Sequence, residues 1–297
     1  MMRRFILITV ALILVYVALI QWKMWGHVKR NVDPSLNSAQ GKHADGTQQV
    51  YSFSFSKYTE TGAREIEIQG DSADILAEKV KLVNVIAKAY AEESPVTVTA
   101  DKGSFNKSTN DVWLEHNVVA TTEDGTRLIT EKLRIRPESK QMESDIATKV
   151  KKNNIHIEGI GAKSDSGIGK VVFKRNVTVV VQDPNAESKH PTVITCDGPL
   201  DIDYKANVAH FQKNVVAQDE RGTLSSDFMD VIYNNSSRRV SKMIAWGNVE
   251  ILTKDGNKTL SDNAIYLAEE GRVILGGDVN AKYQKTEASK EQKDLLL

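Results

Sequence analysis

Residues 226–249, SDFMDVIYNNSSRRVSKMIAWGNV, hold one full copy of the pattern that predicts the fold. The copy opens on an acidic residue after a small one, Ser226-Asp227, and closes on a polar turn before valine, Gly247-Asn248-Val249. Asn-Val or Asp-Val recurs at Asn117, Asn176, Asn214, Asn248 and Asp278, and the small-acidic step precedes four of these by 16 to 21 residues, at Ala100-Asp101, Cys196-Asp197, Ser226-Asp227 and Ser261-Asp262. Such self-similarity predicts a stacked array of two-strand units, none of which buries its apolar face alone. The alternative is that Asn-Val merely starts strands, as in any β-protein, but it leaves the shared upstream Asp unexplained.

The segments around these copies predict strands. Apolar and polar side chains alternate at 64–69, 96–100, 154–158, 177–181 and 200–204, as in half-buried β-strands. Turn residues fall between such segments at 123–125, 255–256 and 270–271. The fold class predicted is all-β, with an antiparallel sheet.

One stretch has a different local pattern. Leu76, Val80, Val83, Ala87 and Tyr90 follow helical spacing after a possible cap at Asp71, so local pattern alone predicts a helix over 73–90.

Composition excludes several classes of protein. The 297 residues allow one large or two modest domains, and they carry 39 basic and 39 acidic side chains. A net charge of zero gives no overall field that attracts nucleic acid, so we expect no such partner. The single cysteine, Cys196, excludes a disulfide scaffold and leaves the compartment open.

The first residues predict a membrane anchor. Phe5–Ile20 is an apolar run, and a helix continued through Trp25 would span about 31 Å, the thickness of a bilayer's hydrocarbon core. A cleaved signal peptide is the alternative, but residues 21–25, QWKMW, form a poor cleavage site. Basic residues balance across the run, so charge alone predicts no orientation. The polar stretch 28–49 predicts a linker.

Two regions resemble known families. Residues 68–90 (IQGDSADILAEKVKLVNVIAKAY), 96–101 (VTVTAD), 112–118, 128–135 and 159–161 leading to Val177 resemble the lipopolysaccharide export protein C (LptC) family. Residues 195–279, with their Ser-Asp steps, Ala264-Ile-Tyr266 and the Gly-Asn-Val turn, resemble the lipopolysaccharide export protein A (LptA/OstA) repeat. The resemblance covers 50–285 and implies strands over 73–90, against the local helical spacing. It also implies an antiparallel slit β-jelly-roll (β-taco).

The chain departs from the LptC pattern in length. A typical member ends near the position of Val181, whereas here a polar stretch with two prolines, 182–191, leads into further repeats. The predicted organisation is an anchor at 1–27, a linker at 28–49, an LptC-like jelly roll at 50–183, a linker or long loop at 184–191, an LptA/OstA-like repeat region at 192–285 and a charged tail at 286–297. Whether a separate LptA docks at its end is left open.

No catalytic or metal-binding pattern stands out. The six histidines are scattered, so we predict no metal site and no cofactor. Asp201 and Asp203 share one strand face, which a solvated surface explains better than acid–base chemistry. Residues 159–164 and 169–170 miss the nucleotide-binding fingerprints, and turns beside strands explain them. Cys196 fits a small buried residue better than a nucleophile.

Three functions are therefore compared: a lipid-transfer bridge component, a membrane-anchored β-solenoid scaffold or adhesion protein, and an enzyme. An apolar groove favours the first, a filled interior the second and a polar pocket the third. The candidate lipid-groove residues are the inward members of the alternating segments: Ile66, Ile68, Val96, Val98, Ala100, Ile155, Ile157, Leu200, Ile202, Tyr204, Val249 and Ile251.

The resemblance also implies partners and a location. It implies lipopolysaccharide as the bound lipid, a single-pass inner-membrane protein with a periplasmic body, and docking through unpaired strand edges. The first edge, with Val50, Phe53 and Phe55, would meet the inner-membrane ABC transporter. The last, with Val279, Ala281 and Tyr283, would meet an LptA-like bridge protein or an LptD-like outer-membrane receptor.

Overall fold

The computed structural model describes residues 48–90, 95–165, 167–182, 191–237 and 239–282. The predicted anchor and the linker up to residue 47 lie outside these residues, as do the tail and Tyr283. The described part is all β, which confirms the predicted class. Its strands are β1 (Gln48–Tyr58), β2 (Arg64–Ile75), β3 (Lys79–Ala89), β4 (Val96–Asn106), β5 (Val112–Thr122), β6 (Arg127–Arg136), β7 (Gln141–Lys152), β8 (Ile155–Asp165), β9 (Lys170–Val181), β10 (Thr192–Cys196), β11 (Leu200–Asp203), β12 (Val208–Asp219), β13 (Gly222–Asn234), β14 (Arg239–Thr253), β15 (Lys258–Leu267), β16 (Arg272–Gly276) and β17 (Asn280–Lys282).

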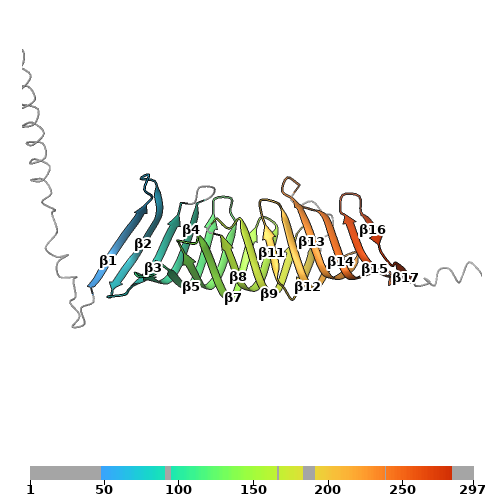
Figure 1. Ribbon diagram of the computed structural model, residues 1–297, viewed down its shortest axis with the longest axis horizontal. Helices are drawn as coiled ribbons and strands as arrows, with labels where there is room; N and C mark the ends of the chain where they lie inside the picture. The colour runs from blue at the N-terminus through green and yellow to red at the C-terminus, as the bar shows by residue number, and fades with distance from the viewer. Residues whose placement is uncertain (1–47, 91–94, 166, 183–190, 238, 283–297) are drawn as a thin grey trace, which may run out of the picture. The chain divides into compact units, whose positions relative to one another are not determined.

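The strands form one antiparallel sheet in which chain neighbours pair, from β1 at one end to β17 at the other (Figure 1). β10 and β11 are two pieces of one broken strand, because both pair with β9 on one side and with β12 on the other. β16 and β17 are likewise two pieces that pair with β15. The sheet therefore continues from β9 into β10 and β11, past the predicted boundary at 184–191.

Most strands bend in the middle, and the repeated motif lies at the bend. The register between neighbours shifts at Glu115/Val118, Gln212/Val215 and Trp246/Val249, as in β-bulges. The residues passed over include Asn117, Asn214 and Asn248, with φ of 51°, 50° and 51°. Asparagine tolerates this left-handed conformation better than most residues do.

Each of these asparagines is hydrogen-bonded to the acidic residue that precedes it in the repeat. The Nδ2 atoms of Asn117, Asn214 and Asn248 donate to Oδ2 of Asp101, Asp197 and Asp227 over 2.7, 2.6 and 2.7 Å. In the last copy Asp278 replaces asparagine: Gly277 takes the positive φ of 82°, and the Asp278 backbone N–H donates to Asp262 over 3.0 Å. The sequence repeat is thus a bend held across two strands.

The helix expected from local spacing at 73–90 is wrong, and β2 and β3 occupy this stretch, as the resemblance implied. The bend explains the error. Asn84 has a φ of 52° and donates to Asp71 over 2.6 Å, which makes Asp71 a bend partner and not a helix cap. Because the bend interrupts alternation, the inward residues Leu82 and Val85 are three apart, which resembles helical periodicity.

Inward side chains from both sides of the bends form one core. In β5, Leu114 before the bend and Val118 after it are both buried. Gly159 lets the backbone of β8 pack directly against the aromatic ring of the fully buried Phe173. A Cβ at this position would lie only 2.7 Å from Cδ1 of that ring. The folded-over sheet is consistent with a slit jelly roll.

Candidate functional site

The turns form two edges that face each other over the interior. Alternate turns of an antiparallel meander lie on the same edge, because each strand reverses the chain direction. We name the edge with turns 123–126, 153–154, 220–221 and 254–257 the first lip. The second lip holds turns 107–111, 137–140, 167–169, 204–207, 235–237 and 268–271.

All twelve candidate groove residues lie on the inner face. Eight are buried and four are half-buried and packed against the core; in that order they are Ile68, Val96, Val98, Ala100, Ile157, Leu200, Ile202 and Val249, then Ile66, Ile155, Tyr204 and Ile251. The apolar residues of the alternating segments thus all lie on the same surface of the sheet, its inner face. Lipid contact at this surface stays a prediction.

The interior differs between the middle of the sheet and its C-terminal end. In the middle, a cavity of about 60 Å³ lies among Ile157, Leu200, Ile202 and Tyr204. Near the C-terminal end, a pocket of about 470 Å³ lies between the lips, with Gly222 and Thr253 next to the first lip on one side and Arg239 and Gly271 at or next to the second lip on the other. Apolar side chains that line this pocket include Leu224, Met243, Ile251, Tyr266 and Val273. Of these two spaces, the C-terminal pocket is the larger and is on the scale of a lipid segment.

Among the described residues, Tyr233 and Tyr204 contact residues of the opposite lip above the small cavity, and we name these contacts the seam. The Tyr233 hydroxyl donates to Oδ1 of Asn154 over 2.7 Å, between residues 79 positions apart. The Lys152 ammonium lies 4.6 Å from the ring centre of Tyr204. In both contacts the tyrosine comes from the second lip and its partner from the first.

Electrostatics fix the first-lip side of the seam. Lys152 pairs with Asp124 over 2.9 Å. Burial acts to raise the pKa of Asp124, but hydrogen bonds from Thr122, Lys152 and Thr126 outweigh it and hold that pKa well below its usual range. Burial, and then the Asp124 charge, raise the pKa of Tyr204, whose hydroxyl is buried without a hydrogen-bond partner among the described residues.

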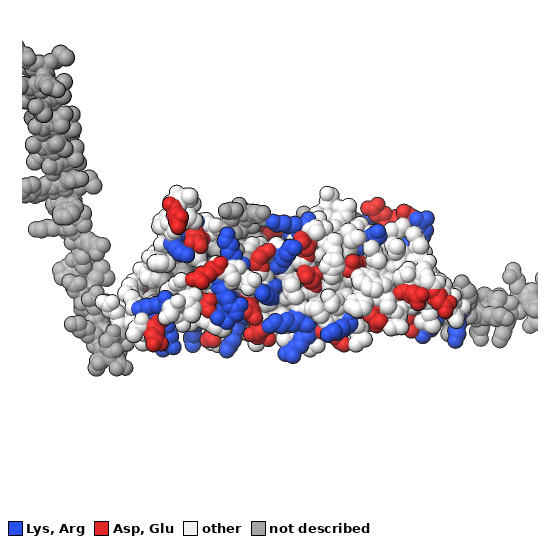
Figure 2. Space-filling view, viewed as in Figure 1, with Lys and Arg blue, Asp and Glu red and all other residues white. Residues whose placement is uncertain are grey.

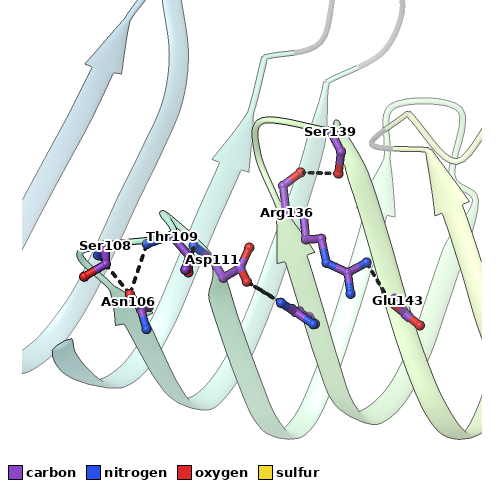
Figure 3. A network of polar contacts seen from close by, with 8 residues as sticks. Asn106, Ser108, Thr109, Asp111, Arg136, Ser139 and Glu143 are labelled. Atoms are coloured by element: carbon purple, nitrogen blue, oxygen red, sulfur yellow. Dashed lines mark hydrogen bonds and ion pairs between the residues drawn. The ribbon is translucent and has the colours of Figure 1, made fainter. Parts of the chain in front are cut away.

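Elsewhere the second lip carries contacts that run along it. Asp111 binds Arg134 in the neighbouring strand, Arg136 pairs with Glu143 over 2.7 Å, and Asn106 caps its own turn (Figure 3). Charged side chains of both signs are spread over the outer surface (Figure 2). The two ion pairs of the second lip are partly buried, whereas exposed pairs such as Lys149–Glu158 contribute little to stability and give solubility.

The sheet ends at two unpaired edges. At the first, Val50 and Phe55 are exposed, whereas Phe53 packs its ring against Gly70, where a Cβ would lie 2.6 Å from Cε1 of the ring. At the last, Val279 and Ala281 are exposed, and Ala281 pairs with Thr259 of β15. The outer sides of β1 and β17 have no partner strand among the described residues.

Nothing in the described part indicates catalysis or metal binding. No cluster of three or more His, Cys, Asp or Glu that could hold a metal occurs there. Cys196 is buried, and burial raises the pKa of its thiol, the opposite of what a nucleophile needs. Gly161 has a φ of 74° at a bend, which gives that glycine a structural role.

Comparison with known families agrees with this geometry. The model for lipopolysaccharide-assembly, LptC-related proteins matches residues 11–182, more than half of the chain. The chain belongs to the LptC-related family. A second model, LptA/(LptD N-terminal domain) LPS transport protein, matches residues 194–293. A search of curated proteins finds no match.

Membership in the LptC-related family supports a role in lipopolysaccharide transport and not an enzymatic one. The LptC-related match ends where β9 ends, and the LptA-type match begins within β10, so the pairing of β9 with β10 and β11 joins the two regions. In the part of the chain that the structure describes, no helix has the length and apolar character needed to cross a bilayer.

The seam is the feature that sequence reasoning missed. Of its members, only Tyr204 was a candidate residue, and it was singled out for its inward position. Asn154 and Tyr233 are too far apart in the chain for any local period to connect them. Asp71 and Asn84 could have been found, because they have the acidic residue and the Asn-Val step of the repeat at a shorter spacing of 13 residues.

Proposed function

We propose that this protein is an inner-membrane-anchored, periplasmic component of lipopolysaccharide export. It receives lipopolysaccharide from the ABC transporter and passes it along the inner face of the sheet toward the outer membrane. The observation that carries the proposal is the continuous sheet across β9, β10 and β11, which links an LptC-type region to an LptA-type region. In this chain the two regions share one interior, so no docking step between separate proteins is needed at that joint.

The inner face suits the lipid part of such a molecule. It is apolar along its length, and acyl chains placed against it leave water, while a slit lets a polar headgroup stay solvated. The pocket of about 470 Å³ at the C-terminal end is where acyl chains would leave for the next carrier.

Photocrosslinking tests the proposal. Photoreactive residues at Ile66 and Ile251, both half-buried on the inner face, should capture lipopolysaccharide in cells. The matched control is Thr97, on the outer face between Val96 and Val98. Equal capture at all three positions, or none at the inner ones, would contradict transport along the interior.

The anchor is a separate part of the proposal. The apolar run at 5–20 motivates an uncleaved helix with everything after residue 28 in the periplasm. A topology reporter fused after residue 46, before β1, should be active only outside the cytoplasm. A mature protein that begins near residue 25 would contradict it.

One observation favours the second candidate, a β-solenoid scaffold or adhesion protein. The middle of the interior is filled, with a cavity of only about 60 Å³. A scaffold would keep this region closed, whereas a lipid carrier must open it.

A further inference from the structure

We infer that the seam is a latch: the lips part at Tyr204 and Tyr233 to admit lipid, then close behind it. This inference rests on the proposed function and adds the step at which passage is controlled. The seam lies above the joint between the two family regions, since it connects turn 153–154 of the first with turn 204–207 and the end of β13 of the second.

The interior itself requires an opening step. A cavity of about 60 Å³ holds only a few water-sized groups, far less than a lipid with several acyl chains. The apolar side chains at its base are buried, with Ile194 and Leu200 at 0% exposure and Ile157 at 3%. A lipid that moves along the inner face must therefore displace a lip at this point.

Each side of the seam is built independently of the other. On the first lip, the Asn154 side-chain amide donates to the Gln182 carbonyl, which leaves Oδ1 facing Tyr233, and Asp124 holds Lys152. On the second lip, the backbone N–H of Tyr233 donates to Asn207 over 2.9 Å, and that of Tyr204 donates to Gly169 over 2.9 Å.

Opening therefore disturbs little of the sheet. Among the described residues no strand pairing joins the lips at the seam, so parting them breaks side-chain contacts and leaves every backbone ladder intact. A neutral hydrogen bond and a cation–π contact are individually weak and re-form readily. Such contacts suit a latch that opens and closes repeatedly, whereas the many hydrogen bonds of a backbone ladder would be too stable for this.

Thiol labelling measures the opening without lipid. The background variant is the full-length protein with Cys196→Ser, because serine already occupies the equivalent position in two other bends, at Ser226 and Ser261. In this background, Ile157→Cys puts the only thiol beside the cavity. Tyr233→Phe removes the hydrogen bond to Asn154 and should raise the maleimide labelling rate about two- to tenfold. As the control, Tyr51→Phe removes the hydroxyl of an exposed tyrosine in β1, outside the seam, and should leave the rate unchanged.

The labelling result decides the latch by itself. An unchanged rate in Tyr233→Phe, or an equal rise in Tyr51→Phe, overturns it. If Ile157→Cys does not fold, Val179→Cys lines the same cavity and replaces it as the labelled position.

Locking the lips tests the link to lipid. Asn154→Cys with Tyr233→Cys, joined by a bis-maleimide, holds the seam shut. The control pair, Asn207→Cys with Asn235→Cys, joins two residues of the second lip whose side chains already contact each other. With photoreactive residues at Ile66 and Ile251, the locked seam should keep lipopolysaccharide at Ile66 and lose it at Ile251, and the control should keep both.

The outcomes of these experiments distinguish failure of the latch from failure of the proposed transport function. Capture at Ile251 behind a locked seam overturns the latch and leaves the proposed function standing. Absence of capture at both positions in the unlocked protein overturns the proposed function, and the labelling rates still decide whether the seam opens.

Discussion

At the scale of single residues, the fold depends on asparagines in the left-handed conformation. Asn248 combines a φ of 51° with a 2.7 Å hydrogen bond to Asp227. Glycine can adopt the angle but has no side chain to donate, and alanine offers neither property. The repeat therefore needs asparagine specifically, or the Gly277-Asp278 solution of the last copy.

A substitution series at this bend separates the two contributions. Asn248→Ala should lower the free energy of unfolding by about 1–3 kcal/mol, because it adds backbone strain to a lost hydrogen bond. Asn248→Gly should cost less, about 1 kcal/mol, since the backbone stays relaxed. Urea denaturation measures both; equal losses in the two variants would show that backbone strain plays no part.

The Asp124 carboxylate makes stability depend on acid. Its folded-state pKa lies below the value near 3.9 of an unfolded aspartate, so its contribution is present above that pH and is lost as the pH falls through the folded pKa. Asp124→Asn should flatten the fall in stability below about pH 4 relative to the native chain. Melting temperatures measured from pH 7 to pH 3 check this, with Asp255→Asn at an exposed turn as the control.

A buried charge tests whether the interior can open. Ile202 is 6% exposed beside the small cavity, and a carboxylate there would cost several kcal/mol unless it reaches water. We expect Ile202→Glu, like Ile157→Glu, to keep β-type circular dichroism, lose lipopolysaccharide crosslinking and fail to support outer-membrane assembly. Val180→Glu, on the outer face, should affect none of these. Unfolding of both inner variants would indicate a closed core and favour the scaffold.

At the scale of elements, alternation predicted five strand segments and their inner faces, and the repeats predicted the stacked arrangement of the strands. The period-two segments name the buried face correctly because one side chain in two must leave water in a two-faced sheet. The error at 73–90 shows the limit. A bulge shifts the alternation by one residue, and a local window cannot distinguish that shift from a helical period.

The candidate site was predictable only in part, for a related reason. The inward residues can be predicted from the local alternation of apolar and polar side chains. The contacts between the lips cannot, because they form only when the whole sheet has bent. Asn154 and Tyr233 have no shared signal in the sequence, and the filling of the interior above Ile157 depends on side chains from several strands.

The last strand should act as a docking edge. Ala281→Pro, in the middle of β17, removes a backbone donor from a short terminal strand and should weaken association with the next bridge component while the core stays folded. Ala281→Ser is the matched control. Co-purification with an LptA-like or LptD-like partner measures the effect, and unaltered association with proline present would count against docking through this edge.

At the scale of the whole molecule, the sheet passes through the joint between the two family regions. The pairing of β9 with β10 and β11 buries Val177 and Ile194 in the same core, so the interiors of the two regions are continuous. This continuous core distinguishes the protein from one in which two separate domains are joined by a flexible linker.

The described sheet should therefore unfold in one transition. Trp113 lies in β5 and Trp246 in β14, on opposite sides of the joint. One variant keeps Trp113 and replaces Trp246, and the other keeps Trp246 and replaces Trp113. The denaturation curves followed by the fluorescence of each remaining tryptophan should coincide, because a cooperative unit unfolds as a whole. Separate midpoints would mean that the regions unfold independently. A chain cut after residue 182 would expose the edge of β9 and should aggregate.

The separation of 79 positions between Asn154 and Tyr233 also sets the time that elapses between their synthesis. At about 5–20 residues per second, a ribosome needs roughly 4–16 s to make the second partner after the first. During that interval the nascent sheet has an uncovered apolar trough and a growing edge. Chaperones that guard this protein should be needed most while β8 to β13 are emerging, and far less once Tyr233 has been made.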